Sequence, residues 1–120
     1  MIEINPDSLT PAYDQIRTQI ETIAASGVLP PGHPLPSIRQ LAADLGLAPG
    51  TVARAYRELE AAGVVITRTG RGTSIATTAP RLSERERRAR LVTAARDYVT
   101  LIQRLGIAQD QALAAVRDLF

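Results

Sequence analysis

The chain has 120 residues, of which 45% are hydrophobic and only 3% aromatic, with no cysteine and a single histidine. This composition predicts a small folded protein with an aliphatic core, and it excludes disulfide frameworks, cysteine-based metal sites and multi-histidine metal sites within one chain. The scarcity of aromatic residues argues against a protein that binds single-stranded nucleic acid by stacking bases.

Charge is distributed unevenly along the chain. All 14 basic residues are arginine, and they exceed the 12 acidic residues to give a net charge of +2. The segment 35–80 carries five arginines against three acids, and the segment 81–104 carries seven against three. Positive charge is therefore concentrated in the segments 35–80 and 81–104. Because arginine presents a planar fork that suits phosphate and guanine edges, these segments are candidates for binding a polyanionic partner.

The N-terminus has neither the basic region nor the apolar run of a signal peptide, and no apolar stretch reaches the length of a membrane span. We therefore expect a cytoplasmic protein that does not bind membranes. Nothing in the chain calls for a cofactor.

The first helix is predicted to follow Thr10, as its N-cap, with Pro11 as the first helical residue. Gly27 is expected to end this helix, and the proline-rich segment 30–36 to form a stiff loop. The apolar residues of the helix recur at helical spacing and are Tyr13, Ile16, Ile20, Ile23 and Ala24.

Two helices joined by a tight turn are predicted next. Ser37 is expected to cap the second helix with Gln40 completing a capping box, Gly46 to supply the turn, and Pro49 to open the third helix. The buried faces are predicted to contain Ile38, Leu41, Ala42 and Leu45, then Val52, Ala55, Tyr56, Leu59 and Ala62. This order is typical of proteins that place a helix in the major groove of DNA.

A β-hairpin is predicted after the third helix. Residues 64–67 and 73–76 alternate as strands, with the hairpin turn over 68–72. Residues 77–80 are interpreted as a linker. The hairpin would be the wing of a winged helix-turn-helix domain.

The third helix and the hairpin tip carry most of the residues expected to contact DNA. A helix that enters the major groove needs small or polar residues near its start and basic residues further along. A glycine-rich tip allows close backbone approach, with Arg71 entering the minor groove. The predicted DNA-binding residues are Ser37, Arg39, Gly50, Thr51, Arg54, Arg57, Gly70, Arg71, Gly72 and Thr73.

Each of these assignments has a structural alternative. Arg54 and Arg57 could belong to a solvated face, and Arg39 could form an ion pair with Asp44 or Glu21. Ser37 is expected mainly to cap the second helix, and a phosphate contact is its secondary role. The arginines over 81–90 either contact flanking phosphates or, as we favour, are solvated among glutamates.

Two further helices are predicted in the C-terminal part. Ser83 and Glu86 form a second capping box, and Gly106 ends the fourth helix. The apolar stripe of that helix is longer than a two-helix tail can cover, which favours pairing across a two-fold axis over packing back on the winged domain. The predicted dimer-interface residues are Leu91, Val92, Ala95, Tyr98, Val99, Ile102, Leu105, Leu113, Val116 and Phe120.

The resulting hypothesis is a mainly α protein with a small β-wing. Residues 1–80 would form the winged helix-turn-helix domain, and residues 81–120 a helical dimerisation domain that could also bind an effector. As a homodimer it would bind an inverted repeat in double-stranded DNA and regulate transcription.

Two alternative functions remain open. One is a small-ligand sensor with a pocket at the dimer interface, lined by Tyr98 and Phe120. The other is a protein-interaction adaptor that has lost DNA binding. No nucleophile–base pair, phosphate-binding loop or spaced carboxylate pair is present, and the lone His33 is expected to be solvated, so neither an enzyme nor a metal site is predicted.

Several motifs together resemble the GntR family of bacterial transcription factors. They are Pro11-Ala12-Tyr13-Asp14-Gln15-Ile16, Leu35-Pro36-Ser37-Ile38-Arg39, Leu41-Ala42, Thr51-Val52, Ala55-Tyr56-Arg57-Glu58-Leu59-Glu60, Gly63 and Arg71-Gly72-Thr73. The short tail is similar to that of the YtrA subfamily. The resemblance implies a dimeric repressor, often of an operon that encodes an ABC-type membrane transporter.

The resemblance also implies which residues contact DNA. They are Arg39, the start of the recognition helix at Thr51, and the wing tip with Gly70, Arg71 and Gly72. The chain departs from the family at Ala48-Pro49-Gly50-Thr51, where Ser-Arg-x-Thr is frequent. Because Pro49 replaces that arginine, base reading is expected to shift to Arg54 or to the backbone near Gly50.

Overall fold

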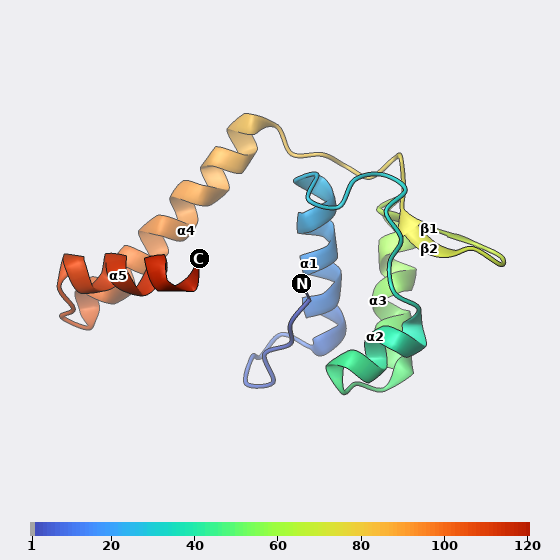
Figure 1. Ribbon diagram of the computed structural model, residues 1–120, viewed down its shortest axis with the longest axis horizontal. Helices are drawn as coiled ribbons and strands as arrows, with labels where there is room; N and C mark the ends of the chain where they lie inside the picture. The colour runs from blue at the N-terminus through green and yellow to red at the C-terminus, as the bar shows by residue number, and fades with distance from the viewer. Residues whose placement is uncertain (1) are drawn as a thin grey trace. The chain divides into compact units, whose positions relative to one another are not determined.

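A computed structural model describes residues 2–120, which divide after Leu82 into two compact units (Figure 1). The first unit contains α1 (Ala12–Ala25), α2 (Ile38–Leu45), α3 (Pro49–Ala61), β1 (Val65–Arg68) and β2 (Gly72–Ile75). The second contains α4 (Glu84–Arg104) and α5 (Gln109–Leu119). The fold is a winged helix-turn-helix followed by two C-terminal helices, which confirms the predicted fold class.

Helix α1 begins one residue later than predicted. Pro11 is the N-cap, with an extended backbone (ψ 150°), and its carbonyl accepts the backbone N–H of Gln15 at 3.0 Å. Thr10 therefore does not cap the helix, and its carbonyl instead accepts the Gln15 side-chain amide at 2.8 Å. The predicted apolar spacing is confirmed by the buried residues of α1, which are Ile16, Ile20 and Ala24.

The turn between α2 and α3 forms as predicted, but the capping box at its entrance is only half formed. The Ser37 hydroxyl accepts the backbone N–H of Gln40 at 3.0 Å. The Gln40 side chain donates to Asp44, one turn further along, at 2.7 Å instead of returning to Ser37. Gly46 has φ +67°, a left-handed conformation that glycine adopts without steric cost, and Pro49 opens α3.

The buried faces of these helices are narrower than predicted. Leu41 and Ala42 are buried in α2, whereas Ile38, at the first helical position, is exposed. Ala62 is the C-cap of α3 and is also exposed, because the helix has already ended there. The buried residues of α3 are Val52, Ala55, Tyr56 and Leu59, as predicted.

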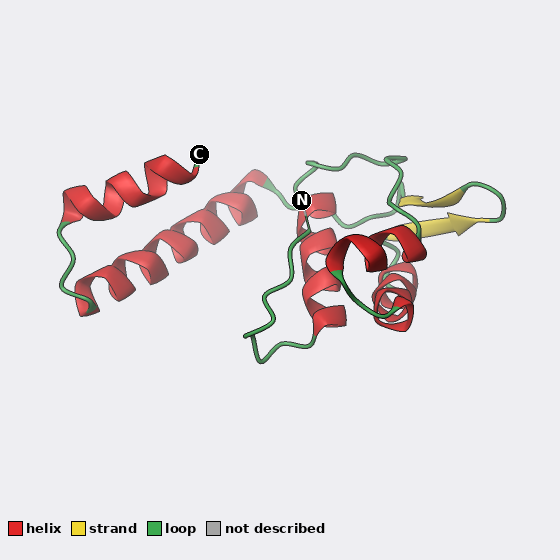
Figure 2. Cartoon of the chain, turned by 60° about the horizontal axis from the view of Figure 1, so that its bottom comes forward, coloured by secondary structure: helices red, strands yellow, loops and turns green. Residues whose placement is uncertain are grey.

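The hairpin strands are each displaced by one residue from their predicted bounds. The antiparallel register pairs Val65 with Ile75 and Arg68 with Gly72, which leaves 69–71 as the turn. A single bridge between Pro34 and Ser74 adds the proline-rich loop to the edge of the hairpin (Figure 2). Val65 and Ile75 are buried, so the base of the wing belongs to the core of the first unit.

The segment interpreted as a linker is packed against the first unit. Ala79 is buried with the core, and the Thr78 hydroxyl donates to the carbonyl of Gly63 at 3.0 Å. The backbone N–H of Leu82 donates to the carbonyl of Ala25, at the end of α1, at 2.9 Å. Residues 77–80 thus connect the hairpin to α4 without forming a helix or strand, and hydrogen bonds hold the connection against the first unit as far as Leu82.

The second unit is a helix pair. Ser83 and Glu86 form the predicted capping box at the start of α4. The Tyr98 hydroxyl donates to the carbonyl of Ala112 at 2.9 Å and ties α4 to α5. No residue of α4, which the structure describes throughout, is buried. Within residues 2–120, no helix has the length and apolar character needed to cross a membrane.

Candidate nucleic-acid interface

The start of α2 presents Ser37 and Arg39. The Ser37 hydroxyl accepts a bond as the helix cap, and its own proton stays free to donate to another group. Arg39 is exposed in the first turn of α2, where the backbone N–H groups and the helix dipole favour an anion. The two side chains thus lie exposed at the N-terminal end of α2.

The ion-pair alternatives for Arg39 are not realised among residues 2–120. Asp44 accepts the side-chain amide of Gln40, and Glu21 accepts the guanidinium of Arg17 at 2.9 Å. The ion pairs that the described chain forms involve only Arg17 and Arg87 as cations. Arg39 therefore has its guanidinium available for an external anion.

Helix α3 has one face buried in the core and one face exposed to solvent. Tyr56, on the buried face, donates its hydroxyl to the carbonyl of Pro36 at 2.7 Å, and burial raises the pKa of this phenol to about 12. Gly50 and Arg57 are exposed, and Thr51 is half-buried at the helix start. Apart from its chain neighbours and the backbone of its own helix, Gly50 has no described atom within 4 Å of its Cβ position, so the backbone there is open to close approach.

Arg54 is the candidate whose surroundings the sequence did not predict. Its guanidinium carbon lies 3.7 Å from the centroid of the Tyr13 ring on α1. A cation at this distance over an aromatic face is attracted by the ring quadrupole. Tyr13 was expected only as a core residue of α1, and no spacing rule within one helix relates it to a side chain on α3.

A carboxylate cluster between α1 and α3 was also missed. Arg17 donates to Asp14 and Glu21 on its own helix, and its Nε lies 3.9 Å from Glu58 Oε2 on α3. The hydrogen bond to Asp14, and then that to Glu21, raise the pKa of Arg17 further above its usual range. The i, i+3 and i, i+4 spacings could have predicted the pairs on α1, but the contact to Glu58 depends on tertiary packing.

The wing tip carries one exposed cation between two glycines. Gly70 has φ +79° and Gly72 has φ +76°, conformations that other residues rarely adopt. The backbone N–H of Arg71 donates to the carbonyl of Arg68 at 2.9 Å, and the Arg71 side chain is exposed. Thr73 follows Gly72 in β2, and its hydroxyl forms a hydrogen bond of 3.0 Å with the hydroxyl of Thr67 on β1.

These elements belong to one compact unit. Helices α2 and α3 and the hairpin lie on the same side of α1, and the hairpin extends beyond the helices (Figures 1 and 2). Five arginines and three acids occupy segment 35–80, and one of those acids, Glu58, faces Arg17. The structure thus brings a helix start, a recognition helix and a basic wing together in one compact unit.

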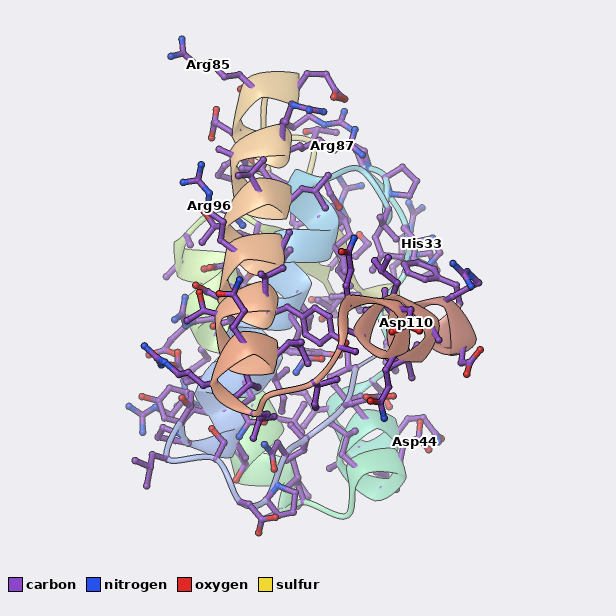
Figure 3. The ribbon with its side chains drawn as sticks, turned by 90° about the vertical axis from the view of Figure 1, so that its left-hand side faces the viewer. His33, Asp44, Arg85, Arg87, Arg96 and Asp110 are labelled. Atoms are coloured by element: carbon purple, nitrogen blue, oxygen red, sulfur yellow. The ribbon has the colours of Figure 1, made fainter. Side chains whose placement is uncertain are left out.

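The arginines of α4 form a separate basic surface. Arg87 pairs with Glu84 at 2.7 Å, whereas Arg85 and Arg96 point away from the helix on one side (Figure 3). Arg85, Arg88 and Arg96 flank a shallow groove that also includes Val92 and Thr93. Of the arginines over 81–90, Arg87 thus has a glutamate partner, which agrees with the expectation that these arginines are solvated among glutamates.

The second unit contains an apolar groove of about 840 Å³ between α4 and α5. Tyr98, Ile102 and Val116 are half-buried along it. Phe120 is the C-cap of α5, fully exposed and outside the groove, so Tyr98 and Phe120 do not share a pocket within one chain. The remaining predicted interface residues are exposed, and they are Leu91, Val92, Ala95, Val99, Leu105 and Leu113.

A winged helix-turn-helix with an open recognition helix and a basic wing defines the class of DNA-binding regulators. Residues 12–75 match the family described as "Bacterial regulatory proteins, gntR family". The chain therefore belongs to the GntR family, and it is a DNA-binding transcriptional regulator and not an enzyme.

Two curated relatives and one solved structure illustrate this relationship. The HTH-type transcriptional regulator Rv1152 of Mycobacterium tuberculosis is 44% identical over 86% of this chain and 80% of its own length. The HTH-type transcriptional repressor YtrA of Bacillus subtilis is 47% identical over 62% of this chain and 58% of its own length. YtrA of Sulfolobus acidocaldarius, a GntR-family transcription factor, superposes with a TM-score of 0.59 and 35% identity over 78% of this chain and 95% of that structure. The predicted likeness to YtrA proteins is thereby confirmed.

Proposed function

We propose that this chain is a homodimeric repressor that binds an inverted-repeat operator in double-stranded DNA. The observation that carries the proposal is a set of exposed arginines, Arg39, Arg57 and Arg71, which lack an ion-pair partner among residues 2–120 and lie on a DNA-binding fold. Unpaired surface arginines release counterions when they meet phosphates, which supplies affinity and salt dependence.

In this proposal the contacts divide by element. Ser37 and Arg39 hold a phosphate at the start of α2. Gly50, Thr51, Arg54 and Arg57 face the major groove from α3, and Gly70, Arg71 and Gly72 enter the adjacent minor groove. Thr73 supports the wing through its bond to Thr67, so its contribution to DNA binding is indirect.

The dimeric state is supported by the second unit. Leu91 is 64% exposed and Val99 is 49% exposed on α4, which buries no residue, and Leu105, the C-cap of that helix, is 60% exposed. A second copy would remove these side chains from water, and burial of apolar surface stabilises by about 25 cal/mol per Å². Pairing through a two-fold axis would present two recognition helices to half-sites roughly 34 Å apart.

Repression is the regulatory effect that we propose, because the Bacillus relative is named a repressor. By resemblance to the YtrA subfamily, we propose an operon for a membrane transporter as the target. A reporter driven by the selected operator would be repressed by the chain and released by loss of Arg71. Activation of that reporter would contradict the proposed effect.

In vitro selection of duplexes from a random pool tests DNA reading and symmetry together. The purified protein, verified as folded by circular dichroism, is expected to enrich an inverted repeat at moderate salt. A single unrepeated site would contradict dimeric binding, and the absence of any enriched sequence would contradict specific DNA binding and favour the adaptor function.

A small-ligand sensor is a second candidate, favoured by the apolar groove between α4 and α5. A ligand that binds only the folded state raises its melting temperature. A thermal-shift screen of small apolar acids and amides is expected to yield a compound whose effect is abolished by Ile102→Glu within the groove. A screen in which the same shift survives that substitution would contradict the groove as the site.

A further inference from the structure

Arg54 is the only arginine of α3 that stacks on an aromatic ring among the described residues. Its Cζ lies 3.7 Å from the Tyr13 ring centroid, well inside the roughly 6 Å range of cation–π contacts. Tyr13 is half-buried near the start of α1, while Arg54 is exposed. The contact therefore joins a ring anchored in the three-helix unit to a cation on the recognition helix.

Stacking occupies the face of a guanidinium and leaves its edges free. The five N–H groups of arginine lie in the guanidinium plane, in a fork that matches two acceptors at once. A ring under the face restrains the side-chain torsions and so lowers the entropy lost when the fork binds. Arg54 is thus restrained in position while it keeps its hydrogen-bonding edge.

The neighbouring carboxylates do not compete for this edge. Glu58 lies one turn after Arg54 and would be its natural i, i+4 partner. Glu58 Oε2 instead lies 3.9 Å from Nε of Arg17, and Asp14, beside Tyr13, accepts the guanidinium of Arg17. Asp14 is thus hydrogen-bonded to Arg17, whereas Glu58 Oε2 makes no hydrogen bond within the described chain. Neither acid forms an ion pair with Arg54 among residues 2–120.

We propose that Tyr13 is a positioning residue that holds Arg54 for a bidentate contact to a guanine in the major groove. This inference rests on the proposed function and adds the residue that determines specificity at one base pair of each half-site. Guanine presents O6 and N7 as paired acceptors, which the arginine fork matches. A phosphate contact would use the same donors but would not depend on the base.

The test compares Tyr13→Phe, Tyr13→Leu and Arg54→Ala on the selected duplex and on all of its single-base-pair variants. Tyr13→Phe keeps the aromatic face, and Tyr13→Leu keeps an apolar side chain without it. Tyr13→Leu is expected to reduce discrimination by about tenfold at one guanine per half-site, and Arg54→Ala to reduce it at the same guanine. Tyr13→Phe is expected to retain the wild-type preference.

The double variant Tyr13→Leu/Arg54→Ala provides the control for a structural effect. It is expected to discriminate no worse than Arg54→Ala alone, because the ring acts only through the arginine. A uniform loss of affinity for all duplexes, or wild-type discrimination in Tyr13→Leu, would overturn the inference and leave the proposed function standing. A wild-type protein that enriches no duplex would overturn both.

Discussion

The Tyr56 hydroxyl donates to the carbonyl oxygen of Pro36 at 2.7 Å and thereby joins the recognition helix to the residue just before the N-cap of α2. Two of the three elements proposed to contact DNA are thus joined by a hydrogen bond from a side chain that is otherwise in the core. The bond adds to the packing of Leu41 and Ala42 against α3 in fixing Ser37 relative to that helix.

Replacing Tyr56 with phenylalanine is expected to lower the free energy of unfolding by about 1 kcal/mol, because the hydroxyl and its hydrogen bond to the Pro36 carbonyl are removed while the ring still fills the core. Burial raises the pKa of Tyr56 from 10.0 to about 12. The folded state retains this proton more tightly than the unfolded chain, so the stabilisation is complete below pH 10 and is lost as pH rises towards 12.

Urea unfolding of wild type and Tyr56→Phe at several pH values measures this effect. The stability advantage of the wild type should be constant up to about pH 10 and should shrink between pH 10 and 12. Tyr56→Phe is the control for the other groups that titrate in this interval, because it differs from the wild type only in lacking the Tyr56 hydroxyl. An advantage that does not change across this interval would contradict the raised pKa.

Arg39→Ala and Arg71→Ala are each expected to weaken operator binding by about tenfold, as the loss of a charge-assisted hydrogen bond predicts. Both side chains are exposed, so the fold should be unaffected. Fluorescence anisotropy across a salt series should show the magnitude of the slope of log K against log salt falling by about 0.9 for Arg39→Ala, whose proposed contact is a phosphate.

Arg104→Ala is the matched control for these variants, because Arg104 is an exposed arginine of α4 outside the proposed DNA surface. It should leave both the affinity and the salt slope unchanged. Unaltered operator binding by both Arg39→Ala and Arg71→Ala would count against the proposed binding mode.

Gly50→Ala is expected to separate stability from DNA binding. Gly50 is helical and has open space around its Cβ position, so alanine should raise the free energy of unfolding by about 0.5 kcal/mol. If the backbone at Gly50 approaches a base or phosphate, the added methyl group should lower operator affinity by about tenfold, the cost of displacing a hydrogen bond.

Thermal unfolding and anisotropy on the same Gly50→Ala sample measure the two quantities. A stabilised variant with wild-type affinity would mean that the DNA backbone does not approach α3 at this point. A destabilised variant would contradict the open space around the Cβ position of Gly50.

The sequence predicted the elements that depend on local chemistry. Ser37, Gly46 and Pro49 act within a few residues of themselves, and the structure places each as expected. The wing glycines, Gly70 and Gly72, follow from the same local rules. The candidate DNA-binding residues could be selected because they combine a type of side chain with a position relative to these local signals.

The errors arose where two contacts compete or where tertiary packing decides the outcome. Within α2, Gln40 bonds to Asp44 one turn further along instead of completing the capping box, and the segment 77–80 packs on the first unit through Thr78 and Ala79. The contact of Arg54 with Tyr13 joins two helices that are far apart in the sequence. Such pairings depend on how α1 packs on α3, which periodicity alone does not specify.

Charge on the exposed apolar face of α4 is expected to dissociate the proposed dimer. Val99→Glu and Leu105→Glu each place a carboxylate at a position that is about half exposed in one chain and would be buried by a second copy. Burying an unpaired carboxylate is strongly unfavourable, so each variant should sediment as a monomer at concentrations where the wild type is dimeric.

Leu9→Glu provides the control, because Leu9 is fully exposed in the first unit and lies outside the proposed interface. It should sediment as the wild type does. The α4 variants should also bind the inverted repeat more weakly than the control but bind an isolated half-site equally well, since only the linkage between half-sites is lost. Wild-type sedimentation by both α4 variants would mean that the chain pairs through another surface.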